Sequence, residues 1–173
     1  KYPEGFELPS DDDVSEILNL ARAHGVNLID TAPAYGSSET RLGHLLPGNR
    51  EDWLICTKAG ENYEACTSTY DFSADAIKRS IHRSLERLKT DYLDLALIHS
   101  NGDDMLILNE TDAIPALAEL KAQGLIRAIG MSTKTVDGGL AALDFIDVVM
   151  VTYNPDATAE RVVIEAARQS NKG

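Results

Sequence analysis

Short apolar runs alternate with longer segments of helical period along the chain, and this alternation limits the possible folds more than any other feature. Most of the runs are almost continuously apolar, as expected of parallel strands that are covered on both faces. The runs with strand character are 26–29, 53–57, 93–98, 126–131 and 148–153. The segments with helical period are 11–24, 39–46, 74–88, 112–123, 136–143 and 159–170. The pattern predicts an α/β fold with a parallel sheet and right-handed crossovers.

Several of the predicted helices have recognisable ends. Ser10 precedes the acidic turn Asp11-Asp12-Asp13, and a serine in that place is a typical helix N-cap. Gly25 follows the same helix, where a left-handed residue ends many helices. Ser73 is the N-cap expected for the longest helix. No linker, repeat or low-complexity stretch interrupts the pattern, so residues 1–173 are predicted to form a single domain.

The composition is that of a globular protein with an acidic surface. The 173 residues include 28 acidic and 16 basic side chains, a formal net charge of −12, which argues against nucleic-acid and anionic-membrane partners. Cys56 and Cys66 are too few for a disulfide framework and do not match a zinc-ligand spacing. The sequence has no signal peptide and no apolar run of about 18 residues, the length of a membrane span. We therefore expect a cytoplasmic protein.

Polar residues follow the predicted strands at their carboxyl ends, the edge at which parallel α/β sheets carry their active sites. These residues are Asp30, Lys58, His99, Ser132 and Asn154. Alternation along the second strand places Lys58 on the same face as Leu54 and Cys56, where an unpaired ammonium would be costly. Asp30, at the end of the preceding strand, is its natural counter-ion. The sequence therefore predicts a buried Asp30–Lys58 pair.

Tyr35 follows Asp30 by five residues, in a loop that can fold its phenol over the same edge. A phenol is a weak acid with an ordinary pKa of about 10, and a nearby ammonium favours its deprotonation. The imidazole of His99 can share the proton or orient a carbonyl group. A Tyr–Lys–Asp–His set therefore suits protonation of a carbonyl oxygen while a hydride reaches the carbon. Each residue alone also has an ordinary structural explanation; their convergence at one edge favours the catalytic one.

Segments along almost the whole chain resemble, in order, the motifs of the aldo-keto reductase family. They are 25–43 with the loop Asp30-Thr31-Ala32-Pro33-Ala34-Tyr35-Gly36, then Thr57-Lys58, 91–100 with His99, 124–132 with Ser132, and 151–155. The resemblance implies a (β/α)8 TIM-barrel fold. About five of its strands and six of its helices are represented in the chain.

The same resemblance implies a function and assigns roles to residues. It implies an NADPH-dependent oxidoreductase that reduces a small aldehyde or ketone to an alcohol without a metal. Tyr35 would be the general acid, and Lys58 with Asp30 would make its phenol more acidic. His99 would orient the substrate carbonyl. Ser132, together with Thr133, would contact the nicotinamide carboxamide.

Two positions depart from the family pattern. Thr133 stands where the family usually has Asn, and Met150 stands where the sixth strand usually offers Gln to the carboxamide. Because a thioether cannot donate a hydrogen bond, one contact to the nicotinamide is expected to be missing. Ser132, Thr133 or a backbone group would have to compensate. The departures keep a second interpretation open, a non-catalytic barrel that binds nucleotide or a partner protein.

The predicted strands are fewer than a closed barrel needs. The first barrel strand would precede residue 11, but Tyr2–Leu8 is too polar to form it convincingly. The seventh and eighth strands, and the basic residues that grip the 2′-phosphate of NADPH, would follow Gly173. A five-stranded sheet has two open edges, which are templates for pairing with another chain. Self-association through these edges is therefore expected of a truncated chain, and an inactive truncated form is a further alternative.

Two connections between strands and helices are unusually long, 59–72 and 100–111. In the first, Tyr63, Tyr70 and Phe72 could line a substrate mouth, or the segment could be a mobile surface loop. The second contains a short apolar run that could pack on the barrel rim or line the pocket. The sequence does not decide between these interpretations.

Overall fold

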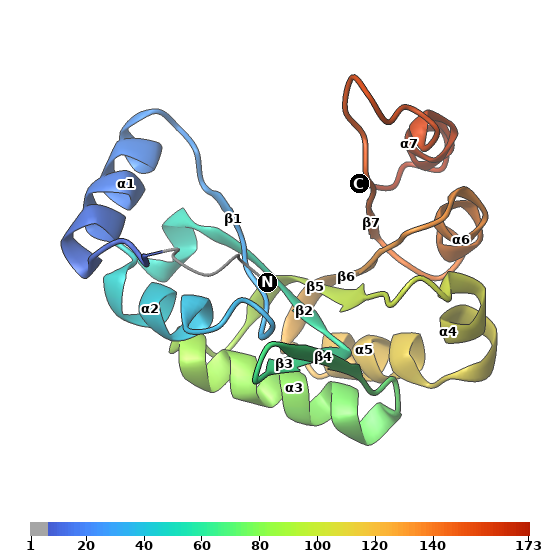
Figure 1. The fold of residues 1–173 in the computed structure, drawn as a ribbon, viewed down its shortest axis with the longest axis horizontal. Helices are drawn as coiled ribbons and strands as arrows, with labels where there is room; N and C mark the ends of the chain where they lie inside the picture. The colour runs from blue at the N-terminus through green and yellow to red at the C-terminus, as the bar shows by residue number, and fades with distance from the viewer. Residues whose placement is uncertain (1–6) are drawn as a thin grey trace.

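The chain forms a curved parallel sheet with helices along its outer side, as seen in a computed structural model that describes residues 7–173 (Figure 1). The five strands of this sheet are β1 (Leu28–Asp30), β2 (Leu54–Ala59), β5 (Leu93–His99), β6 (Ile126–Ser132) and β7 (Val148–Met150). They lie side by side in chain order, and every neighbouring pair is parallel. Because the order never reverses, the sheet is singly wound, as in a barrel, which confirms the predicted fold.

The helices of the described residues agree closely with the predicted segments. They are α1 (Asp11–Ala23), α2 (Ser38–Leu45), α3 (Ala74–Leu88), α4 (Asp104–Glu110), α5 (Ala113–Ala122), α6 (Val136–Ala142) and α7 (Arg161–Gln169). A short 3-10 turn, η1 (Arg50–Asp52), precedes β2. Both predicted N-caps are confirmed: the Ser10 hydroxyl accepts from the Asp13 amide in a capping box, and the Ser73 hydroxyl accepts from the Ala76 amide.

Helix α4 lies in the segment 100–111, which the sequence analysis treated as a loop. Its apolar residues form a continuous run rather than a helical stripe, and it has no side-chain cap, so periodicity gave no signal. Ile107 is its contribution to the core, where it is fully buried. The run therefore packs on the core through Ile107 and the partly buried Leu108, while Met105 and Leu106 remain exposed.

A β-hairpin occupies most of the segment 59–72, the other predicted loop. Its strands, β3 (Glu61–Glu64) and β4 (Thr67–Tyr70), pair antiparallel in a two-stranded sheet of their own. The two residues of the turn, Ala65 and Cys66, both have positive φ, which is the backbone required at the tip of a tight hairpin. The hairpin is held against α3, since the Arg83 guanidinium donates to Asn62 at 2.9 Å.

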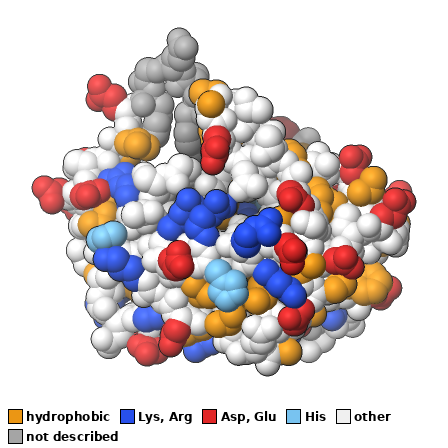
Figure 2. All heavy atoms as spheres, turned by 90° about the horizontal axis from the view of Figure 1, so that it is seen from below, with side chains coloured by type: hydrophobic (Ala, Val, Ile, Leu, Met, Phe, Trp, Pro, Cys, Tyr) orange, Lys and Arg blue, Asp and Glu red, His pale blue; other side chains and the backbone are white. Residues whose placement is uncertain are grey.

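The main core lies between the sheet and the helices. The apolar stripe of α3 is buried, with Ile77 and Ile81 fully inaccessible, and α3 contacts α5 and β2. The outer surface of α3 carries the basic residues of this helix, and Figure 2 shows Lys and Arg side chains gathered with a His on that face. Several of them are paired, such as Lys78 with Glu119 at 2.6 Å. This agrees with a solvated helix face.

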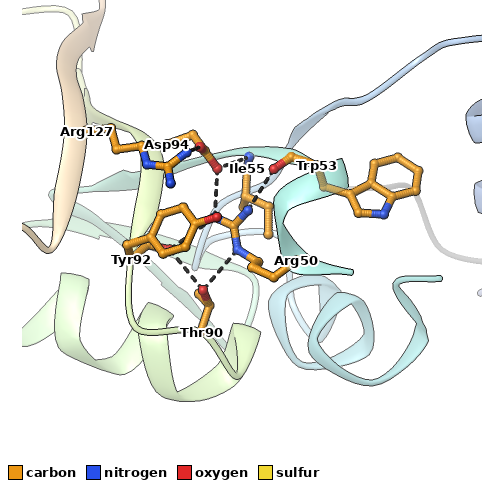
Figure 3. Close-up of polar contacts among 7 residues, drawn as sticks. All are labelled: Arg50, Trp53, Ile55, Thr90, Tyr92, Asp94 and Arg127. Carbon is orange, nitrogen blue, oxygen red and sulfur yellow. Dashed lines mark hydrogen bonds and ion pairs between the residues drawn. The ribbon is translucent and has the colours of Figure 1, made fainter. Parts of the chain in front are cut away.

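The amino ends of the strands are held by a buried carboxylate network (Figure 3). Asp94 accepts hydrogen bonds from the Ile55 amide at 3.0 Å, from Arg50 at 2.7 Å and from Arg127 at 2.9 Å. Both guanidinium groups lie over the ring of Tyr92. The ring centroid is 4.1 Å from Cζ of Arg50 and 4.0 Å from Cζ of Arg127. The network links β2, β5, β6 and η1, and so fixes the register of the central strands.

The two edges of the sheet differ in the described residues. β1 pairs with β2 on one side only, and Leu28 is exposed. Beside β7, the amide of Val149 donates to the Gly173 carbonyl at 3.0 Å, so Gly173 lies where a further strand would pair. Residues 1–6, which include most of the segment considered for the first barrel strand, lie outside the described residues. No helix within residues 7–173 is long and apolar enough to cross a membrane.

Candidate active site

The ammonium of Lys58 lies in a buried ion pair at the carboxyl end of the sheet. Its Nζ is 2.6 Å from Oδ1 of Asp30 and also donates to the Thr31 carbonyl at 3.0 Å. Lys58 is 1% exposed as a residue, whereas the Asp30 side chain is 42% exposed. Parallel pairing of β1 with β2 brings the two strand ends together, as the sequence analysis predicted. The pair keeps a positive charge fixed just below the edge of the sheet.

Tyr35 lies above this ammonium, in the turn that follows β1. The Tyr35 amide donates to the Ala32 carbonyl at 3.0 Å, and Gly36, with φ at 61°, turns the chain into α2. The turn folds the phenol back, so that the Tyr35 ring centroid is 4.9 Å from the Lys58 Nζ. Tyr35 is 42% exposed. The phenol is therefore accessible to a ligand while it lies beside a buried positive charge.

His99 completes the predicted group of four. It is the last residue of β5, and its ring meets the ring of Tyr35 edge-on, with the centroids 6.3 Å apart and the planes at 90°. It is buried except for a small fraction of its surface. The structure thus brings together Asp30, Tyr35, Lys58 and His99, which are separated by up to 69 residues in the sequence, from three neighbouring strand ends.

A second buried carboxylate belongs to this site, and it was not predicted from the sequence. Oε2 of Glu61, in β3, lies 2.7 Å from Nδ1 of His99. Oε1 of the same residue accepts from the Ser68 hydroxyl at 2.6 Å and from the Tyr70 hydroxyl at 3.3 Å. The sequence does contain a signal for this hairpin. β-Branched and aromatic residues (Tyr63, Thr67, Thr69 and Tyr70) lie on both sides of the short turn at Ala65, and such residues are typical of paired strands.

Ser132 and Thr133 lie next to His99, but their side chains have different surroundings. Ser132, the last residue of β6, pairs with His99 on one side and with Met150 on the other. The Thr133 amide donates to the Met150 carbonyl at 3.1 Å. The Thr133 hydroxyl is buried and faces α6, 3.4 Å from the position a Cβ would take at Gly139. Ser132 is therefore the residue of the two whose hydroxyl could reach a ligand at this edge.

The loop after Ser132 is fixed by another buried carboxylate, that of Asp104. One of its oxygens accepts from the Lys134 amide at 2.9 Å, from the Thr135 amide at 2.8 Å and from the Thr135 hydroxyl at 2.7 Å. The other accepts from the Ser100 hydroxyl at 2.5 Å. Asp104 thereby ties the loop after β5 to the loop after β6, on either side of His99 and Ser132.

The thiol of Cys56 lies below the ion pair. Burial, and to a smaller extent the negative charge of Asp30, raises the pKa of Cys56 to about 12. The thiol is therefore fully protonated at neutral pH and acts as a core side chain. Within residues 7–173 there is no group of three or more His, Cys, Asp or Glu side chains placed to hold a metal ion.

The donor set is suitable for a nicotinamide and a carbonyl substrate. An exposed phenol, a buried ammonium and an imidazole converge at one point, and the hydroxyl of Ser132 lies at the adjacent strand end. Met150, opposite Ser132, offers only a weak acceptor sulfur, so it cannot supply the donor that the family pattern has there. The residues present therefore fit a nicotinamide with one hydrogen bond fewer.

Comparison with known proteins agrees with the family resemblance of the sequence motifs. The family model described as "Aldo/keto reductase family" matches residues 4–173. D-arabinose 1-dehydrogenase of Saccharomyces cerevisiae is 36% identical over 132 residues, which are 72% of this chain and 37% of that protein. L-galactose dehydrogenase of Arabidopsis thaliana is 36% identical over 133 residues, 74% of this chain and 40% of that protein. The NADH-specific methylglyoxal reductase of Escherichia coli is 31% identical over 156 residues, 82% of this chain and 48% of that protein.

Solved structures match over most of this chain and part of their own. A solved structure described as "Putative aldo-keto reductase from Pseudomona aeruginosa" has 53% identity and a TM-score of 0.94, covering 96% of this chain and 65% of its own. The chain thus spans about half the length or less of the curated relatives it matches and two thirds of that structure. With the singly wound sheet and the family model matched over nearly all its length, the chain belongs to the aldo/keto reductase family of oxidoreductases, which act on aldehydes or ketones.

Proposed function

We propose that this protein reduces aldehydes or ketones to alcohols with NADPH, and that Tyr35 is the general acid. The observation that supports the proposal best is the position of the Lys58 ammonium, buried with Asp30 and 4.9 Å from the ring centroid of an exposed tyrosine. A fixed positive charge stabilises the phenolate left after proton transfer. Because the chain spans only part of its relatives, the activity is proposed for the protein that contains it.

The residues of the site divide the work of the reaction. When bound, the nicotinamide supplies the hydride to the carbonyl carbon. Tyr35 gives its hydroxyl proton to the carbonyl oxygen, and Lys58 stabilises the phenolate that results. Asp30 keeps Lys58 charged and in place. His99 holds the carbonyl oxygen in line with the phenol, so that proton and hydride reach opposite ends of one double bond.

Ser132 and Thr133 are proposed to serve the cofactor. The Ser132 hydroxyl is placed to bind the carboxamide of the nicotinamide, at the strand end beside His99. Thr133 contributes to the cofactor site indirectly. Its amide bonds the Met150 carbonyl and so joins β6 to β7 beside Ser132, while its side chain faces α6. NADPH is our proposed cofactor. The ratio of kcat/KM values for NADPH and NADH measures which of the two the protein uses, and one relative is by its name NADH-specific.

We place the protein in the cytoplasm. Cys56 and Cys66 are both thiols, which supports a reducing compartment. The exposed outer side of β1 supports self-association if no further strand covers it. Cell fractionation and sedimentation velocity test these two proposals separately.

The reaction is tested by NADPH oxidation with a panel of small aldehydes and ketones. The Tyr35→Phe variant is expected to lose about 10²–10⁴-fold in kcat, the usual contribution of a general acid. Tyr92→Phe is the matched control: its hydroxyl is buried at the amino ends of the strands and has no hydrogen-bond partner there. Equal rates for the wild type and Tyr35→Phe would contradict the role of Tyr35. Binding of NADPH without turnover of any carbonyl would favour the non-catalytic interpretation.

A further inference from the structure

Glu61 is a buried carboxylate at the active site to which the proposed reaction assigns no role. It reaches the site because the backbone turns sharply at Gly60, between β2 and β3. Gly60 has φ of 104°, and a Cβ there would lie 2.7 Å from the Phe72 ring. The Asp71 amide closes the turn by donating to the Gly60 carbonyl at 3.0 Å. Only glycine fits this turn, so the hairpin is anchored at its base with Glu61 directed back toward His99.

The contacts of Glu61 hold its carboxyl group in a fixed orientation. Ser68 and Tyr70 donate hydroxyl hydrogen bonds to Oε1, at 2.6 Å and 3.3 Å. Oε2 lies 2.7 Å from Nδ1 of His99, and both residues are buried. A carboxylate can only accept, so an unprotonated Nδ1 at this distance would place two lone pairs against each other. With Glu61 ionised, Nδ1 of His99 therefore carries a hydrogen.

Two charge states of His99 satisfy this constraint. If the ring is neutral with a hydrogen on Nδ1, its Nε2 is a bare acceptor and repels a carbonyl oxygen. If the ring is protonated, Nε2–H donates to that oxygen, and the carboxylate of Glu61 stabilises the added charge. We propose that Glu61 is a positioning residue that keeps His99 in its protonated form, with Nε2–H as the donor to the substrate carbonyl. This inference rests on the proposed function.

The other charged groups around His99 do not supply this effect. On β2, the positive charge of Lys58 opposes a protonated imidazole, but it is offset by Asp30 of β1 at 2.6 Å. Tyr35, on the loop after β1, meets the ring edge-on. Asp104 of α4 directs its oxygens to Ser100 and to the loop after β6, and the neighbouring residue of β6 is the uncharged Ser132. Among residues 7–173, Glu61 is thus the negatively charged side chain that forms an ion-pair contact with the ring.

The first test measures the charge of His99 directly. Imidazole nitrogen NMR of the wild-type protein, with the His99 signal assigned by loss in His99→Gln, gives the pH at which the ring loses its proton. His24, His44 and His82 are exposed and serve as internal references. We expect the midpoint of His99 to lie above theirs. A midpoint equal to or below those of the references would overturn the proposal, and no Glu61 variant is needed for that result.

The second test removes the charge and keeps the size of the side chain. Glu61→Gln is expected to lower the His99 midpoint by about one pH unit or more and kcat/KM near neutral pH by about tenfold or more, with a smaller loss at acidic pH. Glu64→Gln, on the exposed side of the same strand, is the matched control. Ser68→Ala removes a hydrogen bond to Glu61 but leaves the charge. Equal losses in Ser68→Ala and Glu61→Gln would mean that the hairpin acts only through its structure, and would overturn the proposal.

The two tests separate this inference from the proposed function. If Tyr35→Phe retains full turnover but Glu61→Gln still lowers the His99 midpoint, the general acid is misassigned and the role of Glu61 in the charge of His99 stands. If Tyr35→Phe abolishes turnover but Glu61→Gln leaves the midpoint and the pH profile unchanged, the function stands and the role of Glu61 is wrong.

Discussion

The two ends of the parallel sheet both bury a charged side chain, but they use it differently. At the amino end, Asp94 accepts from one backbone amide and from the guanidinium groups of Arg50 and Arg127, with bonds of 2.7–3.0 Å. At the carboxyl end, Lys58 is paired with Asp30 at 2.6 Å, and that carboxylate remains 42% exposed at its side chain. The first network is closed by protein groups, and the second ends at the solvent.

The difference shows that burial of a charge does not by itself indicate an active site. A carboxylate that is buried and accepts from protein donors at both oxygens is not accessible to a ligand, so its direct contribution is to stability and register. A buried ammonium beside an exposed phenol and an exposed carboxylate leaves donors and acceptors for a substrate. We therefore expect substitutions at the two ends to have different effects. Those at the carboxyl end should lower activity, and those at the amino end should lower stability.

The largest expected effect is the loss of activity in Lys58→Met. Methionine is unbranched like lysine, only one atom shorter, and readily buried, and Asp30 keeps access to water, so the free energy of unfolding should change by less than about 1.5 kcal/mol. Removal of the charge that stabilises the phenolate should lower kcat by about 10²–10⁴-fold. Lys78→Met removes an ion pair of the same 2.6 Å length on the surface of α3 and should leave kcat unchanged. NADPH oxidation and urea unfolding measure the two quantities.

Asp94→Ala should give the opposite result. It leaves the Ile55 amide and two guanidinium groups without their acceptor, which should cost about 3 kcal/mol of the free energy of unfolding. The kcat/KM of the folded fraction should be unchanged, because the network lies at the end of the strands away from Tyr35. Urea unfolding and assays well below the midpoint temperature check both statements. A large fall in kcat/KM with full stability would show that the two ends are coupled.

The sequence predicted much of the carboxyl end and little of the amino end, for a physical reason. A residue that directly follows an apolar strand has its position determined by the strand, so Asp30, Lys58 and His99 could be placed together from the pattern alone. Asp94 lies within the strand β5, and its partners come from η1, β2 and β6. Such a network depends on register between strands, which no local pattern encodes.

Glu61 was not predicted because it lies on the β3–β4 hairpin, which is not part of the repeating strand and helix units of the barrel. The hairpin interrupts the alternation of strands and helices, and its short polar strands have little hydrophobic periodicity. Helix α4 was missed for a related reason, since a helix of 7 residues with one fully buried apolar side chain has no stripe. Long helices with caps, such as α1 and α3, carry enough local signal to be placed within a residue or two.

Asp104→Ala tests what decides whether a substitution lowers stability or activity. The deciding factor is either the bonding of the carboxylate oxygens by protein donors or the position of the residue along the strands. Asp104 lies at the carboxyl end, like Lys58, but its oxygens accept from four protein donors, as those of Asp94 do from three. The variant should lose about 2 kcal/mol of the free energy of unfolding, because buried donors of the loop after β6 lose their acceptor. NADPH binding, measured by fluorescence quenching, should weaken severalfold because that loop follows Ser132. Unchanged NADPH affinity would mean that the loop does not position Ser132.

The smallest effect on stability is expected at Asp147. Like Asp94, it accepts from the backbone amide of a strand and from a basic side chain, but it does so at the surface. Asp147 accepts from the Ile129 amide at 2.9 Å and from Lys121 at 2.6 Å, but its side chain is 37% exposed. Burial alone would raise its pKa, yet the bonds from Lys121 and Ile129, with the charge of Lys172, outweigh burial and lower it. A lowered folded-state pKa stabilises the fold above the ordinary value of about 3.9 and loses that contribution as the pH falls through the folded-state value.

Asp147→Asn should therefore cost less than about 1 kcal/mol at neutral pH, because water and salt screen a half-exposed pair. The difference in free energy of unfolding between wild type and variant should narrow as the pH falls below about 4, where the wild-type carboxyl takes up its proton. Asp144→Asn, at an exposed position on the same connection, is the control and should show no such narrowing. If Asp147→Asn costs as much as Asp94→Ala, exposure does not set the strength of this repeated contact. A small, salt-sensitive effect would instead assign the stability of the amino end to the burial of Asp94 between two arginines.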